Sequence, residues 1–235
     1  MENRYGVAPV PVAALGTDQR VMFIRRTYGH LLAAIAGFVA IETVAFSLGI
    51  AQKVSTTVLG AGGAGWLLVL GGFILVGTLA SRAAARAVTL GAQRAALAGY
   101  VAAEALIFMP MLYLAELQTG GGVIASAALV TMVGFLALTG IAVTSKRDFS
   151  VLRGVLMWVG VAALLAIVGS VIFGAVLGTW FSVAMIAFAG AAILFSTSRV
   201  MRHYPEDRYV SAALELFASV ALMFWYVLRL FMSRR

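Results

Sequence analysis

The amino-acid sequence predicts an all-α membrane protein, a bundle of seven transmembrane helices with the last helix at its centre. Of its 235 residues, 63% are hydrophobic and only 11% charged, whereas a soluble domain is about half apolar and about a quarter charged. Seven apolar stretches each approach the roughly 20 residues that a helix needs to cross a bilayer. An acidic residue, Glu215, lies within the last of these stretches.

The predicted spans divide the chain into a short tail and one transmembrane domain. The connections between them are too short to hold a second domain, so residues 28–235 form one transmembrane domain, preceded by a cytosolic tail, 1–27. The first 19 residues of this tail are predicted to be flexible, because they are polar to mildly apolar and hold two prolines. The predicted spans are 28–51, 62–83, 95–116, 122–145, 152–174, 177–200 and 208–231.

Basic residues predict the orientation in the membrane. Lys and Arg concentrate before the first span and in every second connection, so the amino terminus should be cytosolic. Seven crossings then place Arg234 and Arg235 outside, against this rule. A re-entrant last span would return them to the cytosol. The length of Tyr209–Met232 favours a full crossing.

Glu215 predicts the central position of the last helix. Ser211 and Ser219 lie four residues before and after it, so the three side chains share one helix face. A carboxylate facing lipid costs about 2.5–3.5 kcal/mol, so this face should turn towards other helices. We expect both serine hydroxyls to donate hydrogen bonds to the carboxylate. Arg229, near the end of the span, is expected to extend to the membrane interface.

Three acids fall inside predicted spans: Glu42, Glu104 and Glu215. If all three faced lipid, the summed penalty of roughly 7–10 kcal/mol would rival a typical folding stability. One interpretation is a carboxylate cluster that binds a cation or a proton, which makes the three acids ion-pathway candidates. The other is separate neutralisation by hydrogen bonds, for instance between Glu104 and Tyr100 one turn away.

Several other functions are disfavoured by residue counts. The chain has no cysteine, and His30 and His203 are far apart without ligand spacing, so no metal site or cofactor is predicted. A retinal Schiff base needs a lysine inside a span, but Lys53 and Lys146 lie in connections. No G-x-S-x-G motif or intramembrane aspartate pair indicates a protease, so an enzyme is not expected. The net charge of +8 lies in short connections, which argues against nucleic-acid binding.

Several stretches resemble the Bax inhibitor-1 (transmembrane Bax-inhibitor-motif) family, in particular its bacterial branch. The likeness runs through most of the chain, and its most specific piece is Thr144–Ser150. The other stretches that carry it are Phe23–Leu31, Phe135–Gly140, Ala192–Arg199, Ala213–Ser219 and Tyr226–Arg235.

This resemblance implies a multi-pass protein of the inner membrane with a central last helix. For some members it implies a pH-sensitive calcium leak, or a link to stress response and membrane-protein quality control. In that family two aspartates carry the leak, and Ser196 and Ser219 occupy the matching positions here. The chain therefore lacks the aspartate pair, and Glu215, one turn from Ser219, could substitute in part.

Two functional hypotheses follow. The first is a leak for calcium or protons across the lipid bilayer, with Glu215, Glu104 and Glu42 as its carboxylates. The second is an interaction protein that transports nothing and modulates a membrane-anchored protease or other quality-control machinery. A water-filled path to Glu215 favours the first, and a dry core with neutral acids favours the second.

Overall fold

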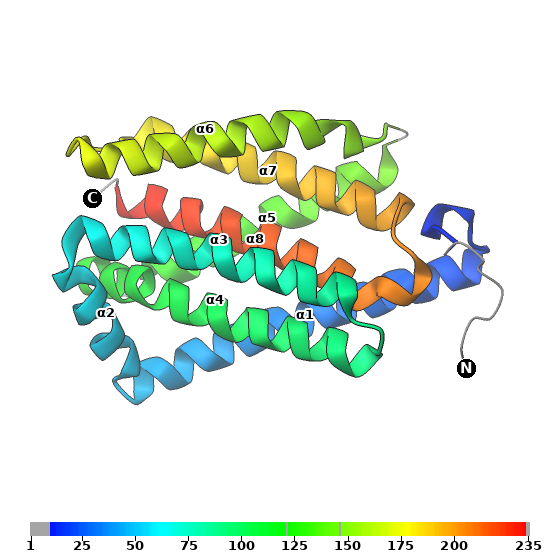
Figure 1. The fold of residues 1–235 in the computed structure, drawn as a ribbon, viewed down its shortest axis with the longest axis horizontal. Coiled ribbons are helices and arrows are strands. Elements are labelled where there is room, and N and C mark those ends of the chain that lie inside the picture. Colours follow the sequence, from blue (N-terminus) through cyan, green and yellow to red (C-terminus); the bar gives the residue numbers. More distant parts are fainter. Residues whose placement is uncertain (1–9, 121, 146, 234–235) are drawn as a thin grey trace.

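The fold is a bundle of long helices (Figure 1). The structure is a computed structural model that describes residues 10–120, 122–145 and 147–233. Seven of its helices are long and apolar enough to cross a membrane, which confirms the predicted fold class. They are α1 (Thr17–Ser47), α3 (Gly62–Arg86), α4 (Leu90–Thr119), α5 (Gly122–Thr144), α6 (Arg153–Ile172), α7 (Thr179–Arg202) and α8 (Tyr209–Met232).

The boundaries of the last six spans match the prediction within one and a half turns. Local groups fix the ends of α4: the Thr89 hydroxyl accepts a 3.2 Å bond from the Ala92 amide, and Gly120 takes the left-handed conformation that often ends helices. The first span differs. Helix α1 begins at Thr17, about three turns earlier than predicted, because the polar first turns continue the helix beyond the apolar stretch.

A short helix, α2 (Ile50–Gly60), fills the predicted connection between the first two spans. Gly49 and Gly62 flank it with positive φ angles of 70° and 56°, which permit sharp turns at both of its ends. A Cβ added at Gly65 would collide with the carbonyl oxygen of Val58, so close packing of α2 on α3 requires this glycine. This glycine-rich stretch therefore combines a turn at Gly62 with a close helix contact at Gly65.

Residues 10–16 are packed against the bundle. Val12, in the short helix η1 (Val12–Ala14), is fully buried, and its amide donates a 2.8 Å bond to the Tyr204 carbonyl. Pro11 and Pro205 pair beside it. The predicted flexibility is therefore wrong for residues 10–16, and also for residues 17–19, which begin α1. Residues 1–9 of the predicted tail lie outside the described residues.

Helix α8 packs against α1, α3, α4, α5 and α7. It has the largest buried share of the seven long helices. Its aromatic side chains interleave with those of α4: the Phe108 ring stacks on Phe224 with centroids 5.7 Å apart and meets Trp225 edge-on at 5.1 Å. Helix α6, by contrast, buries only Ala163 among its described residues.

The predicted basic connections meet at one end of the bundle, here called the basic end, where α1 begins and α3–α4, α5–α6 and α7–α8 are joined (Figure 1). Arg208 donates a 2.7 Å bond to the Ala87 carbonyl, and Arg202 donates a 3.2 Å bond to the Ser145 carbonyl. Lys146 lies outside the described residues. Helix α8 runs the length of the bundle and ends at the opposite end, as a complete crossing requires (Figure 1).

Candidate functional site at the α7–α8 contact

Two serines meet where α7 packs on α8. The Oγ atoms of Ser196 and Ser219 lie 2.9 Å apart, and both residues are buried. Ser219 also donates a 3.1 Å bond to the backbone carbonyl of Glu215. A hydroxyl has a single proton, so Ser219 accepts from Ser196 while it donates to its own helix. The positions that the resemblance matches to the aspartate pair are therefore in direct contact.

The Glu215 carboxylate lies one turn away and is held from the α7 side. Its Oε2 accepts a 2.6 Å hydrogen bond from the Tyr204 hydroxyl, and its Oε1 lies 3.5 Å from Nη1 of Arg199. The Glu215 side chain is 20% exposed, although its Oε1 is itself buried, and that of Arg199 is 42% exposed, so the pair meets solvent or head groups at the basic end mainly through Arg199. Arg199 also lies over the rings of Phe195 and Tyr204.

The expected serine donors to Glu215 are wrong. Ser211 donates instead to the Ala84 carbonyl at 3.2 Å, which ties α8 to the end of α3. Ser219 bonds the backbone of Glu215 and not its carboxylate. Sequence reasoning used Arg199 only for orientation, although it lies near the end of α7 and Glu215 lies near the start of α8. When two antiparallel helices are joined by a short connection, residues near the end of the first helix lie close to residues near the start of the second. The sequence could therefore have predicted that Arg199 lies near Glu215.

Tyr204 remains a hydrogen-bond donor at this site. Burial raises the pKa of its phenol above the ordinary tyrosine range, and the nearby charge of Glu215 raises the pKa further. The phenol therefore keeps its proton at physiological pH and donates it to the carboxylate. A short bond to an ionised acceptor is among the stronger hydrogen bonds in proteins.

Glu42 and Glu104 lie apart from this site, in α1 and α4. Both are buried, Glu104 completely. Within the described residues their carboxyl oxygens make no well-aligned hydrogen bond, although Tyr100 lies close to Glu104, as the hydrogen-bond interpretation proposed. The described chain also brings no three acidic or histidine side chains into a common metal-binding group. A buried acid without a partner is held at lower free energy in its neutral form.

A second polar cluster fixes the α5–α6 connection to the end of α7. Oδ1 of Asp148 accepts 2.9 Å bonds from the Ser150 amide and the Ser198 hydroxyl, and Oδ2 lies 3.0 Å from Nε2 of His203. The Ser150 amide is the main cause that lowers the pKa of Asp148, with smaller contributions from the Ser198 hydroxyl and from His203. Asp148 and Ser150 belong to Thr144–Ser150, the most specific piece of the resemblance, and the cluster gives His203 a structural role at the basic end.

Curated bacterial proteins are similar to part of this chain. An uncharacterized membrane protein of Vibrio cholerae is 38% identical over 121 residues, which are 49% of this chain and 52% of that protein. An uncharacterized protein of Pseudomonas aeruginosa is 31% identical over 117 residues, again 49% of this chain and 52% of that protein. The chain thus spans about half the length of these curated relatives. The sequence profile of the family described as Inhibitor of apoptosis-promoting Bax1 matches residues 20–235, nearly the whole chain, and the protein therefore belongs to the Bax inhibitor-1 family of membrane proteins.

Proposed function

We propose that the protein is a leak for calcium or protons in the inner membrane, with its amino terminus in the cytosol and its gate at the α7–α8 contact. The observation that carries this proposal is the hold on Glu215, whose two carboxylate oxygens face Tyr204 and Arg199. This acid lies one turn from the contact between Ser196 and Ser219, the positions matched to the family's aspartate pair.

The chemistry of the contact suits a passing cation. Calcium prefers oxygen ligands, and the contact gathers the Glu215 carboxylate, its backbone carbonyl and the hydroxyls of Ser196 and Ser219. In the described arrangement Arg199 balances the charge of Glu215, so a cation gains little by entering. Separation of α7 from α8 would release the carboxylate from Arg199 and create an acidic oxygen site. The arrangement thus corresponds to the closed state of the proposed gate.

The two deeper acids are the candidates for the rest of the path. Acidic side chains inside a membrane domain are rare and frequently mark ion or proton pathways. Glu104 and Glu42 are buried without a well-aligned hydrogen bond in the described residues, so each has acceptor atoms for a proton or cation that enters. In this proposal they become accessible only when the bundle opens.

A second candidate function is an interaction protein without transport, which modulates a membrane-anchored protease or other quality-control machinery. The burial of Glu42 and Glu104 among protein atoms favours it, because neutral acids in a dry core require no ion path. The leak remains the better-supported function, since the Glu215 site has an ionisable group, a counter-charge and partial exposure.

Flux into liposomes separates the two functions. Calcium and proton flux through the purified protein should depend on pH, and Glu215→Gln should abolish it, because the amide keeps the size and removes the charge. Thermal stability should fall little, since the half-exposed Arg199 is solvated when it loses its partner. The matched control is Glu116→Gln, at an exposed position of α4. Absence of flux in the folded parent at every pH would support the interaction protein, and full flux in a folded Glu215→Gln variant would remove this acid from the mechanism.

A further inference from the structure

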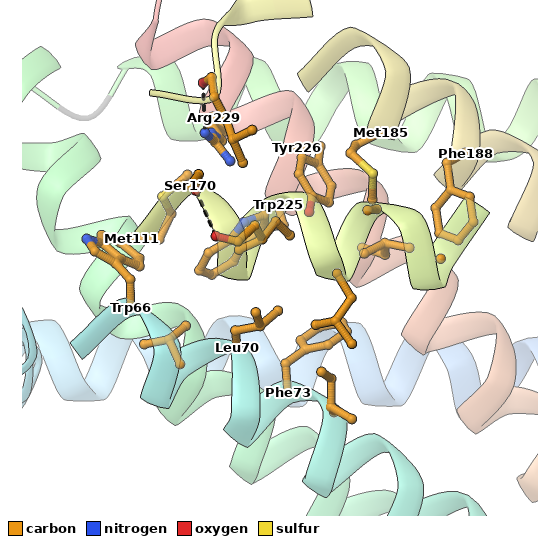
Figure 2. Close-up of a pocket in the computed structure, with 18 of the residues that line it drawn as sticks. Trp66, Leu70, Phe73, Met111, Ser170, Met185, Phe188, Trp225, Tyr226 and Arg229 are labelled. Carbon is orange, nitrogen blue, oxygen red and sulfur yellow. Dashed lines mark hydrogen bonds between the residues drawn. The ribbon is translucent and has the colours of Figure 1, made fainter. Parts of the chain in front are cut away.

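A large cavity lies away from the Glu215 site, between α6 and the face formed by α3, α4, α7 and α8. Its volume is about 930 Å³, near the upper end of the roughly 300–1,000 Å³ found for small-molecule sites. Trp66, Leu70 and Phe73 of α3 line one side, and Trp225 of α8 also lines the cavity (Figure 2).

The cavity exists because α6 packs loosely on the bundle. Ala163 is the single buried residue of this helix. Two residues beside the cavity, Ile74 of α3 and Val161 of α6, are large, apolar and exposed. Exposed apolar side chains on membrane-spanning helices face the hydrocarbon. The cavity therefore opens sideways towards lipid.

One end of the cavity is cationic. Arg229 is the only charged side chain among the described residues that line it, and it lies at the end of the cavity near the α6–α7 connection (Figure 2). Its Nη2 donates a 3.1 Å bond to the Leu177 carbonyl, and its guanidinium lies 5.7 Å from the centre of the Phe181 ring. A guanidinium has five N–H donors, and no acidic side chain of the described residues pairs with this one.

We propose that this cavity binds a membrane phospholipid with an anionic head group, whose acyl chain fills the space beside Trp225 while its phosphate accepts hydrogen bonds from Arg229. The planar fork of a guanidinium matches a phosphate. Arg229 lies in the last turn of α8, at the depth where a bilayer places its head groups, and the apolar cavity below it suits an acyl chain. A zwitterionic head group brings an ammonium that the guanidinium repels, so an anionic lipid should be preferred. The proposal is independent of the leak.

Tryptophan quenching by lipids with brominated acyl chains tests this. Trp158 and Trp180, which are 73% and 85% exposed, contact bulk lipid and are first replaced by Phe. The remaining Trp66 and Trp225 both line the cavity. The protein is placed in phosphatidylcholine vesicles that contain a small, equal fraction of brominated phosphatidylglycerol or brominated phosphatidylcholine. Phosphatidylglycerol should occupy the cavity about fivefold more readily, the preference expected for one cationic side chain at a membrane surface.

Variants then assign this preference to one residue. Arg229→Gln should abolish it, and Arg229→Lys should keep most of it because the charge remains. The control Arg82→Gln, at an exposed position of α3 outside the cavity, should leave it unchanged. Equal quenching by both head groups in the parent would overturn the proposal, as would no quenching by either. If the Arg229→Gln variant keeps the preference for phosphatidylglycerol, the preference comes from the general positive charge of the protein and the proposal is wrong. If Arg229→Gln does not fold, Arg229→Met, which also removes the charge, takes its place with the same expected outcomes.

Discussion

The phenol of Tyr204 donates a 2.6 Å hydrogen bond to Oε2 of Glu215, so the α7–α8 connection holds the acid of the central helix. The backbone carbonyl of Tyr204 also accepts a 2.8 Å hydrogen bond from the amide of Val12. A movement of the amino-terminal segment would therefore reach Glu215 through a single residue. Tyr204 joins the surface of the basic end to the candidate gate.

Tyr204→Phe should loosen the gate. The change removes the hydroxyl that holds Glu215 and leaves the ring in place, so we expect faster cation flux into liposomes. Loss of this hydrogen bond should lower the free energy of unfolding by about 1–2 kcal/mol. Thermal melting in detergent and liposome flux measure the two effects. Tyr113→Phe on α4 is the control, and unchanged flux in a folded Tyr204→Phe variant would argue against a gating role for this hydrogen bond.

Replacement of both Ser196 and Ser219 by Asp should create or strengthen a pH-dependent cation flux. The two Oγ atoms lie 2.9 Å apart, and carboxylates this close cannot both ionise freely, so they titrate as a unit. Flux across a pH series in liposomes reports this shared titration. The matching Asn pair has the same size without charge and should show no such change. A folded Asp pair with the parent's pH profile would contradict the alignment of these positions with the family's pair.

Asp148→Asn should remove stability that depends on pH. The folded pKa of Asp148 lies below its ordinary value of about 3.9, so its contribution is present above that value and disappears as pH falls through the lowered pKa. The parent should therefore melt above the variant at neutral pH, and the two should converge in acid. Melting curves between neutral pH and about pH 3 test this. Asp18→Asn, at an exposed position, is the control. An Asp148→Asn variant that melts with the parent at neutral pH would show that the cluster has no stabilising role.

Single cysteines should report the proposed orientation, because the natural chain has none. We expect Leu117→Cys to react with an impermeant reagent from outside intact cells, and Val88→Cys and Val151→Cys to react only after permeabilisation. All three positions are exposed at the ends of helices or in connections. Reaction of the Val151→Cys variant in intact cells would reverse the orientation.

Much of the fold follows from local properties of the sequence. A span needs only enough consecutive apolar residues, and the connections that share a side show it by their Lys and Arg content. The sequence therefore predicts the boundaries of six of the seven spans closely. It misses α2 because eleven mixed residues between two spans give no strong length or hydropathy signal. It also misses the packing of Val12, because burial of a short tail depends on the surface that receives it.

The site shows where local reasoning ends. Helical periodicity places Ser211, Glu215 and Ser219 on one face, but it does not say which helix that face meets. Tertiary packing decided that Ser211 bonds α3, that Ser219 meets Ser196 of α7, and that Glu215 is held across the contact by Arg199 and Tyr204. These hydrogen bonds join different helices and require donor–acceptor distances of about 3 Å. Only the packing of the helices sets such distances between residues that are far apart in the sequence.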